Sequence, residues 1–334
     1  MTHQKTTPQS LASRLTVAVL CCLPFIANSQ DIHFSQIDVN PILYSPAYSG
    51  FFDGKGRFGI TYRSQWASVS TPYQTFAASG EFSLLPGKYR RNGLSIGAFV
   101  YNDHAGSLNY GTVSANAILS YYQSVNSSNN TLVSFALEGG YSQCGMNSED
   151  ALFGDPSEII DNPVGHYYTV GAGVALFHQA TNNLNFKFGL SGRNLNRPQI
   201  TFTGMEGNFI NRKLNGYLRT EYRCTSMWSI LPLAAVQLQH NNTEIVVGCD
   251  AKYHYSEIAG THIVYSAGLY YRHADALIFN VAAEIDAFVV SVNYDANIST
   301  LSEASNSIGA LELSLIYRLT RSKNKTRPIP CATY

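Results

Sequence analysis

"RFGITYRSQW", residues 57–66, alternates between two kinds of side chain. Phe58, Ile60 and Tyr62 fall on one face of an extended chain, and small or polar residues fall on the other. An alternation with a period of two predicts a strand with one apolar face. The pattern returns at residues 73–84, 132–141, 184–192, 288–296 and 310–317. The chain is therefore predicted to be rich in strands from residue 57 onward.

Two architectures fit such strands. In a soluble sandwich the apolar face turns inward, whereas in an outer-membrane barrel it faces lipid and the polar face lines the lumen. The predicted strands run to about ten residues, the length of a tilted membrane crossing, while soluble strands average about five or six. Aromatic residues near the strand ends predict interfacial girdles. These are Tyr62, Trp66, Tyr121, Tyr122, Tyr167, Tyr168, Tyr270, Tyr271 and Tyr317. The membrane barrel is the favoured prediction.

The composition supports this choice. The 334 residues hold 22 Lys plus Arg and 22 Asp plus Glu, so the formal net charge is zero, unlike that of a typical nucleic-acid binder. Only 13% of residues are charged, about half of the usual share in soluble domains. The chain is also rich in Tyr (22), Phe (17) and Gly (26).

The N-terminus predicts export. Lys5 and Arg14 precede the apolar run 15–27, and "ANS" at 27–29 offers small residues for cleavage, so residues 1–29 are predicted to be a cleaved signal peptide. The run is shorter than the roughly 20 residues that a spanning helix needs. Lipidation at Cys21 or Cys22 is a weaker alternative, because "AVL" before Cys21 lacks the small residue expected directly ahead of such a cysteine.

Fourteen strands account for the rest of the chain, an even number that places both barrel ends on the periplasmic side. Residues 30–55 are expected to be a plug or lead-in segment, 56–320 the barrel, and 321–334 a basic periplasmic tail. The long connections 145–163 and 194–211 are predicted to be outer loops. The predicted strands begin at Arg57, Tyr73, Asn92, Leu108, Thr131, His166, Leu184, Arg212, Trp228, Thr243, Ile263, Ala276, Phe288 and Ile308.

Charged residues on the lumen-facing register carry both signs. A selective pore concentrates one sign, so the balance favours charge pairs that close the lumen or hold a plug. These residues are Arg57, Arg63, Glu81, Glu138, Lys187, Arg193, Arg219, Glu221, Glu284 and Glu312. The sequence carries no G-x-S-x-G elbow, and His254, Glu257 and His262 lack zinc-site spacing. We therefore expect neither an enzyme nor a metal or other cofactor.

The stretch 34–50, "FSQIDVNPILYSPAYSG", followed by "YRSQW" at 62–66, resembles the start of the PorP/SprF family of type IX secretion and gliding proteins of Bacteroidota. The residues that carry the resemblance are Phe34, Ser35, Gln36, Asn40, Pro41, Pro46, Ala47, Tyr48, Gly50, Tyr62, Arg63, Gln65 and Trp66. Ser45 departs from the Asn that often precedes the second Pro. Further likeness lies at 97–106, 292–301, 312–317 and 330–334.

The resemblance implies a non-enzymatic outer-membrane barrel that helps to secrete or anchor a surface protein bearing a type IX C-terminal domain. It also implies a periplasmic, peptidoglycan-linked lipoprotein as a partner. A porin or hydrophobic-solute channel is the alternative. Candidate partner-binding residues in the outer loops are Asp150, Phe153, Asp155, Asp161, Arg197, Phe202 and Phe209.

The opening stretch is itself expected to fold back as a periplasmic plug, because a barrel of this size encloses more space than its own side chains fill. Phe34, Ile37, Tyr44 and Tyr48 would pack, while Gln36 and Asn40 would satisfy lumen charges.

Overall fold

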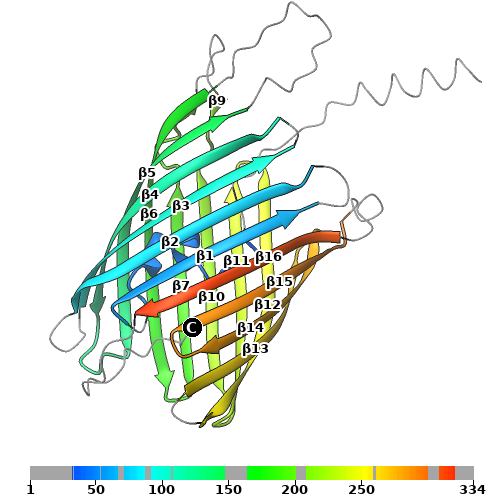
Figure 1. Cartoon of the computed structure of the whole chain (residues 1–334). Helices are drawn as coiled ribbons and strands as arrows, with labels where there is room; N and C mark the ends of the chain where they lie inside the picture. The colour runs from blue at the N-terminus through cyan, green and yellow to red at the C-terminus, as the bar shows by residue number, and fades with distance from the viewer. Residues whose placement is uncertain are drawn as a thin grey trace, which may run out of the picture. The chain divides into compact units, whose positions relative to one another are not determined.

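A computed structural model gives a closed antiparallel barrel of fourteen strands in the part of the chain that it describes (Figure 1). The described residues are 32, 34–52, 54–66, 71–86, 92–106, 108–146, 164–200, 208–258, 261–299 and 308–319. Consecutive strands pair around the barrel, β7 pairs with β10, and β16 closes the sheet against β1. Closure excludes the sandwich and confirms the predicted barrel.

The strand boundaries follow the alternation. Each of the fourteen predicted starts lies within two residues of an observed one. The barrel strands are β1 (Gly56–Gln65), β2 (Tyr73–Pro86), β3 (Asn92–Ala105), β4 (Tyr110–Ser124), β5 (Thr131–Gly145), β6 (Val164–Thr181), β7 (Leu184–Arg193), β10 (Lys213–Arg223), β11 (Trp228–Gln239), β12 (Asn242–Ile258), β13 (Thr261–Arg272), β14 (Ala276–Ile285), β15 (Phe288–Asn297) and β16 (Ile308–Leu319). Two further strands, β8 (Gln199–Ile200) and β9 (Asn208–Phe209), form a separate small sheet that the sequence pattern did not predict.

The two faces of the barrel wall differ as the period of two requires. Large apolar side chains such as Leu137 and Val281 are 66% and 61% exposed on the outer face. Polar and charged side chains such as Arg63 and Glu312, which are paired directly across β1 and β16, are buried on the inner face. Within the described ranges, no helix is both long and apolar enough to cross a bilayer.

The predicted aromatic girdles are only half right. Tyr121, Tyr168 and Tyr271 are exposed on the outer face, as are Tyr62 and Tyr317. The other tyrosine of each Tyr–Tyr pair is buried and points inward. These buried residues are Tyr122, Tyr167 and Tyr270. Adjacent residues of a strand lie on opposite faces, so only one tyrosine of each Tyr–Tyr pair can reach lipid.

Residues 34–52, here called the lumen segment, lie inside the barrel and precede β1 (Figure 1, dark blue). They form α2 (Pro41–Tyr44) and the 3₁₀ turn η1 (Pro46–Tyr48), each with a proline in its first turn. Proline suits that position because its φ is pre-set and its missing N–H would have no helical acceptor. Ser45 between them is extended, so the two turns do not merge into one helix.

Candidate functional site

The lumen segment runs along the length of β1 in the opposite direction. At one end Ser35 contacts Arg63, and at the other Phe52 stacks under the Arg57 guanidinium, whose carbon lies 5.3 Å from the ring centroid. Arg57 and Arg63 are six residues apart on β1, or about 20 Å of strand. The segment therefore spans much of the lumen.

A first polar cluster holds the start of the segment. Arg63 donates to Asp295 at 2.9 Å and to Glu312 at 3.2 Å, and all three side chains are at most 3% exposed. Arg272 also pairs with Asp295 at 3.1 Å. Ser35 Oγ lies 2.6 Å from both Arg63 and Arg272, and it donates to Asp295 Oδ2 at 2.7 Å. The segment thus completes a buried network of four charged wall residues.

A second polar cluster contacts Asp38, deeper along the segment. Arg219 pairs with Asp38 at 3.1 Å and with Asp250 at 2.5 Å. Tyr217 donates to Asp38, and Tyr270 donates to Asp250. The wall here carries charges of both signs, and the segment supplies one of the two carboxylates that compensate Arg219.

Other charged residues of the wall pair with one another. Arg57 pairs with Glu81, Arg193 with Glu138 and Arg318 with Glu284. Balanced charge pairs were predicted for this register, and the structure confirms them. The prediction missed Asp38, Asp250, Arg272 and Asp295, although Asp295 falls on the polar face of an alternating stretch that the sequence showed.

Apolar packing fills the space between these clusters. Ile37, Tyr44 and Tyr48 belong to one buried cluster with wall residues, and Phe34 packs against it. Gly189 makes room for this packing, since a Cβ at that position would collide with the ring of Tyr48. Burial raises the pKa of Tyr44 and of Tyr48 well above the ordinary value.

Gln36 and Asn40 were expected to satisfy charges, and here the prediction is wrong for both side chains. Gln36 bonds Asn280 at 3.3 Å and Ser291 at 2.5 Å. Asn40 donates to the Thr61 hydroxyl at 2.7 Å and accepts from Ser79. The charged acceptor near Gln36 is Glu312, and it receives the Gln36 backbone N–H at 3.1 Å.

Three further family-signature residues lie near the end of β1. Tyr62 faces outward, while Gln65 ends the strand and Trp66 follows with φ 56°. Of the candidate loop residues, Asp150, Phe153, Asp155, Asp161 and Phe202 lie outside the described residues. Arg197 stacks over Phe209 beside the small β8–β9 sheet, with its guanidinium carbon 5.6 Å from the ring centroid.

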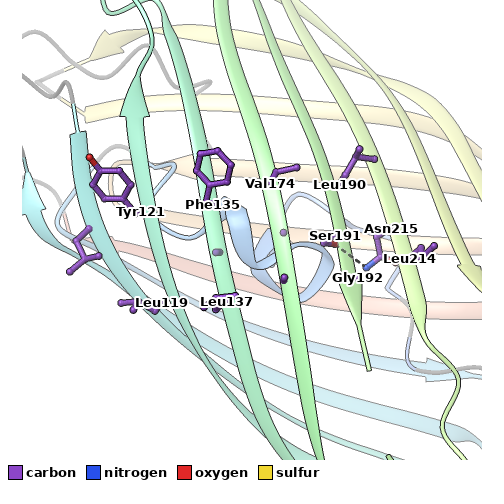
Figure 2. Close-up of a pocket in the computed structure, with 14 residues that line it drawn as sticks. Leu119, Tyr121, Phe135, Leu137, Val174, Leu190, Ser191, Gly192, Leu214 and Asn215 are labelled. Carbon is purple, nitrogen blue, oxygen red and sulfur yellow. Dashed lines mark hydrogen bonds between the residues drawn. The ribbon is translucent and has the colours of Figure 1, made fainter. Parts of the chain in front are cut away.

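A second feature is an apolar groove of about 730 Å³ on the outer face of the barrel (Figure 2). Ala172 on β6 pairs directly with Gly192 on β7, and these small residues leave a depression. Leu137 on one side and Leu214 on the other are the next residues across the sheet. Such a surface suits a hydrocarbon chain, because its outward-pointing lining offers almost no polar partner.

Comparison with solved structures identifies the fold. The toluene transporter TbuX of Ralstonia pickettii is 11% identical with a TM-score of 0.51, covering 85% of this chain and 94% of that chain. The toluene transporter TodX of P. putida (9% identical, TM-score 0.48) covers 85% and 95%. A Pseudomonas aeruginosa FadL homologue (8% identical, TM-score 0.49) covers 82% and 92%. At these identities the likeness concerns the fold alone.

Comparison by sequence identifies the family. No curated protein matches the chain. The family model described as "Type IX secretion system membrane protein PorP/SprF" matches residues 26–317, which is most of the chain. The chain therefore belongs to the PorP/SprF family of type IX secretion system membrane proteins.

Proposed function

We propose that this outer-membrane barrel helps to secrete or anchor a cell-surface partner protein that carries a type IX C-terminal domain. The family supports a role in type IX secretion. The observation that carries the proposal is the filled lumen: residues 34–52 occupy it through buried ion pairs and close packing. A wall built around a protein segment suits the handling of a polypeptide better than the free diffusion of solutes.

The partner would be recognised at the outer mouth. We propose contacts through the loops that include Asp150, Phe153, Asp155 and Asp161, and through Arg197, Phe202 and Phe209 of the β7–β10 connection. Arg197 and Phe209 support this because they form one exposed stack, and Phe209 is 56% exposed. Arginine and aromatic side chains are enriched at interface hot spots. A periplasmic, peptidoglycan-linked lipoprotein would engage the opposite side.

Comparative surface proteomics of cells with and without this protein tests the proposal. The surface fraction should lose one or a few large proteins that end in a type IX C-terminal domain, while other cargo of the same system stays at wild-type abundance. The double variant Arg197→Ala, Phe209→Ala should reproduce part of the loss, and Arg212→Ala, a nearby exposed charge, serves as its control. An unchanged surface proteome would contradict the proposal.

A channel for small hydrophobic solutes is a second candidate, favoured by the outer groove. The inward-facing residues Ser191 and Asn215 also line this groove (Figure 2). They lie next to the point where the small residues Ala172 and Gly192 pair. Flux of a small apolar solute into proteoliposomes, abolished by Ala172→Trp, would support this candidate. Flux that does not exceed that of empty liposomes would exclude it.

A further inference from the structure

The barrel wall binds several main-chain groups of the lumen segment. Glu312 accepts the backbone N–H groups of Ser35 and Gln36 at 2.9 and 3.1 Å. Glu81 accepts the backbone N–H of Gly50 at 2.9 Å. Both carboxylates are buried, and each belongs to an ion pair with an arginine of the wall.

Backbone carbonyl groups are bound in the same way. Arg193 donates to the carbonyl of Ile42 at 2.8 Å, and Ser95 donates to that of Ser49 at 2.8 Å. Ser191 and Asn215 both donate to the carbonyl of Tyr44, at 3.0 and 2.7 Å. Six wall side chains, from β2, β3, β7, β10 and β16, therefore bond six main-chain groups of the segment.

Main-chain recognition binds polypeptide without reading much of its sequence, as in peptide binding by strand addition. The segment also bonds the wall through its own side chains, which are those of Ser35, Gln36, Asp38, Asn40 and Tyr44. The lumen thus has the chemistry of a peptide-binding site whose occupant is part of the same chain.

The resident segment is an imperfect ligand for this site. The side-chain amide of Asn293 is buried, and neither its nitrogen nor its oxygen has a hydrogen-bond partner among the described residues. The Oδ1 atom of Asp295 likewise has no hydrogen-bond partner among the described residues. A gap of about 30 Å³, lined by Phe34, Gln36 and Lys213 among others, remains between segment and wall. Buried groups without partners cost free energy, so a better-fitting segment can compete.

We propose that the lumen is a polypeptide-binding site in which residues 34–52 are the resident ligand, and that a segment of the secreted partner replaces them. The inference rests on the proposed function and specifies where the partner is held. The partner segment would present two consecutive N–H groups to Glu312 and a carbonyl to Arg193, and it would fill the gap beside Lys213.

A competition assay on the full-length purified protein tests this exchange. The probe is a fluorescent synthetic peptide with the sequence of residues 34–52. A tethered segment acts at roughly millimolar effective concentration, so the peptide binds the unmodified protein poorly. Ser35→Ala weakens only the resident copy and should improve apparent peptide affinity about tenfold, the change that 1.4 kcal/mol produces.

A disulfide lock supplies the matched control. Ser49 and Ser95 have hydroxyl oxygens 3.3 Å apart, so Ser49→Cys with Ser95→Cys can bridge segment and wall. Ser114 and Ser142, 2.8 Å apart, bridge two wall strands without touching the segment. With both pairs built into the Ser35→Ala variant, oxidation should abolish peptide binding in the first pair and reduction should restore it, while the second pair binds in both states. Equal binding by the oxidised and reduced first pair would overturn the inference.

Failure of the exchange can be distinguished from failure of the proposed function. A partner recovered from native membranes together with no peptide binding by the Ser35→Ala variant would reject the exchange and leave the anchoring role standing. Locking the segment in cells with the Ser49–Ser95 disulfide should also reduce surface display of the partner, whereas the Ser114–Ser142 disulfide should not. Normal display by locked protein would likewise reject the exchange.

Discussion

The buried carboxylate of Glu312 offers the sharpest test of how the lumen segment is held. It is 1% exposed and accepts three hydrogen bonds, from Ser35 N, Gln36 N and Arg63 Nη1 at 2.9, 3.1 and 3.2 Å. Glu312→Gln keeps the shape of the side chain but replaces one acceptor oxygen by a donor. Arg63 retains Asp295 at 2.9 Å, so its charge stays compensated. The main loss is one bond between a main-chain N–H and a charged acceptor, which is worth about 1.5–3 kcal/mol.

Hydrogen exchange at the segment measures this loss directly. If the amides of Ser35 and Gln36 exchange through release of the segment, about 1.5–3 kcal/mol corresponds to roughly 10- to 150-fold faster exchange. Glu284→Gln is the matched control, because Glu284 pairs with Arg318 on the wall. Equal exchange at residues 35–36 in both variants, with both barrels folded by circular dichroism, would refute the reasoning.

Further expectations concern the lumen segment and the outer face of the wall. Tyr44→Phe should weaken docking of the segment by about 1 kcal/mol in the exchange assay, because the Tyr44 hydroxyl donates to the carbonyls of Gly216 and Val236 at 3.0 and 2.8 Å. Tyr48→Phe is its control and should be neutral or stabilising, because the buried Tyr48 hydroxyl has no hydrogen-bond partner among the described residues. Docking should weaken as pH rises above 10.0, since the pKa values of Tyr44 and Tyr48 are raised in the folded state and a released segment loses these protons first; exchange that is independent of alkaline pH after correction for intrinsic rates would contradict this. Deletion of residues 31–50 should raise single-channel conductance in planar bilayers, and a closed baseline from correctly folded protein would count against a sealing role. Val281→Arg, at a side chain 61% exposed on the outer face, should destabilise the barrel by about 2–4 kcal/mol in lipid refolding titrations, and a shift below 0.5 kcal/mol would show that this face does not meet hydrocarbon.

The strands could be predicted because their signal is local. In "FVVSVNYDA" the apolar residues at 288, 290 and 292 face outward and Asp295 faces inward, as a period of two requires. The same rule, applied residue by residue, would have placed Tyr122, Tyr167 and Tyr270 inside; grouping each with its neighbour as a girdle pair ignored the alternation. The two-residue strands β8 and β9 are too short to carry any period.

The contacts of the lumen segment depend on distance across the barrel, which sequence spacing does not encode. Ser35 meets Asp295 across 260 residues of chain, and Tyr44 meets Gly216 across 172. The sequence identified Phe34, Ile37, Tyr44 and Tyr48 as packing residues because an irregular aromatic segment must bury its rings. It could not show that the wall would bind backbone groups, since any residue type presents the same N–H and carbonyl.

The central claim, that this barrel serves a secreted partner, is tested most directly by purification of the tagged protein from native outer membranes in mild detergent. Mass spectrometry of the bound material should find a large secreted protein with a type IX C-terminal domain at comparable stoichiometry, together with a periplasmic lipoprotein. Recovery of the barrel alone, from membranes in which the type IX system is active, would contradict the account.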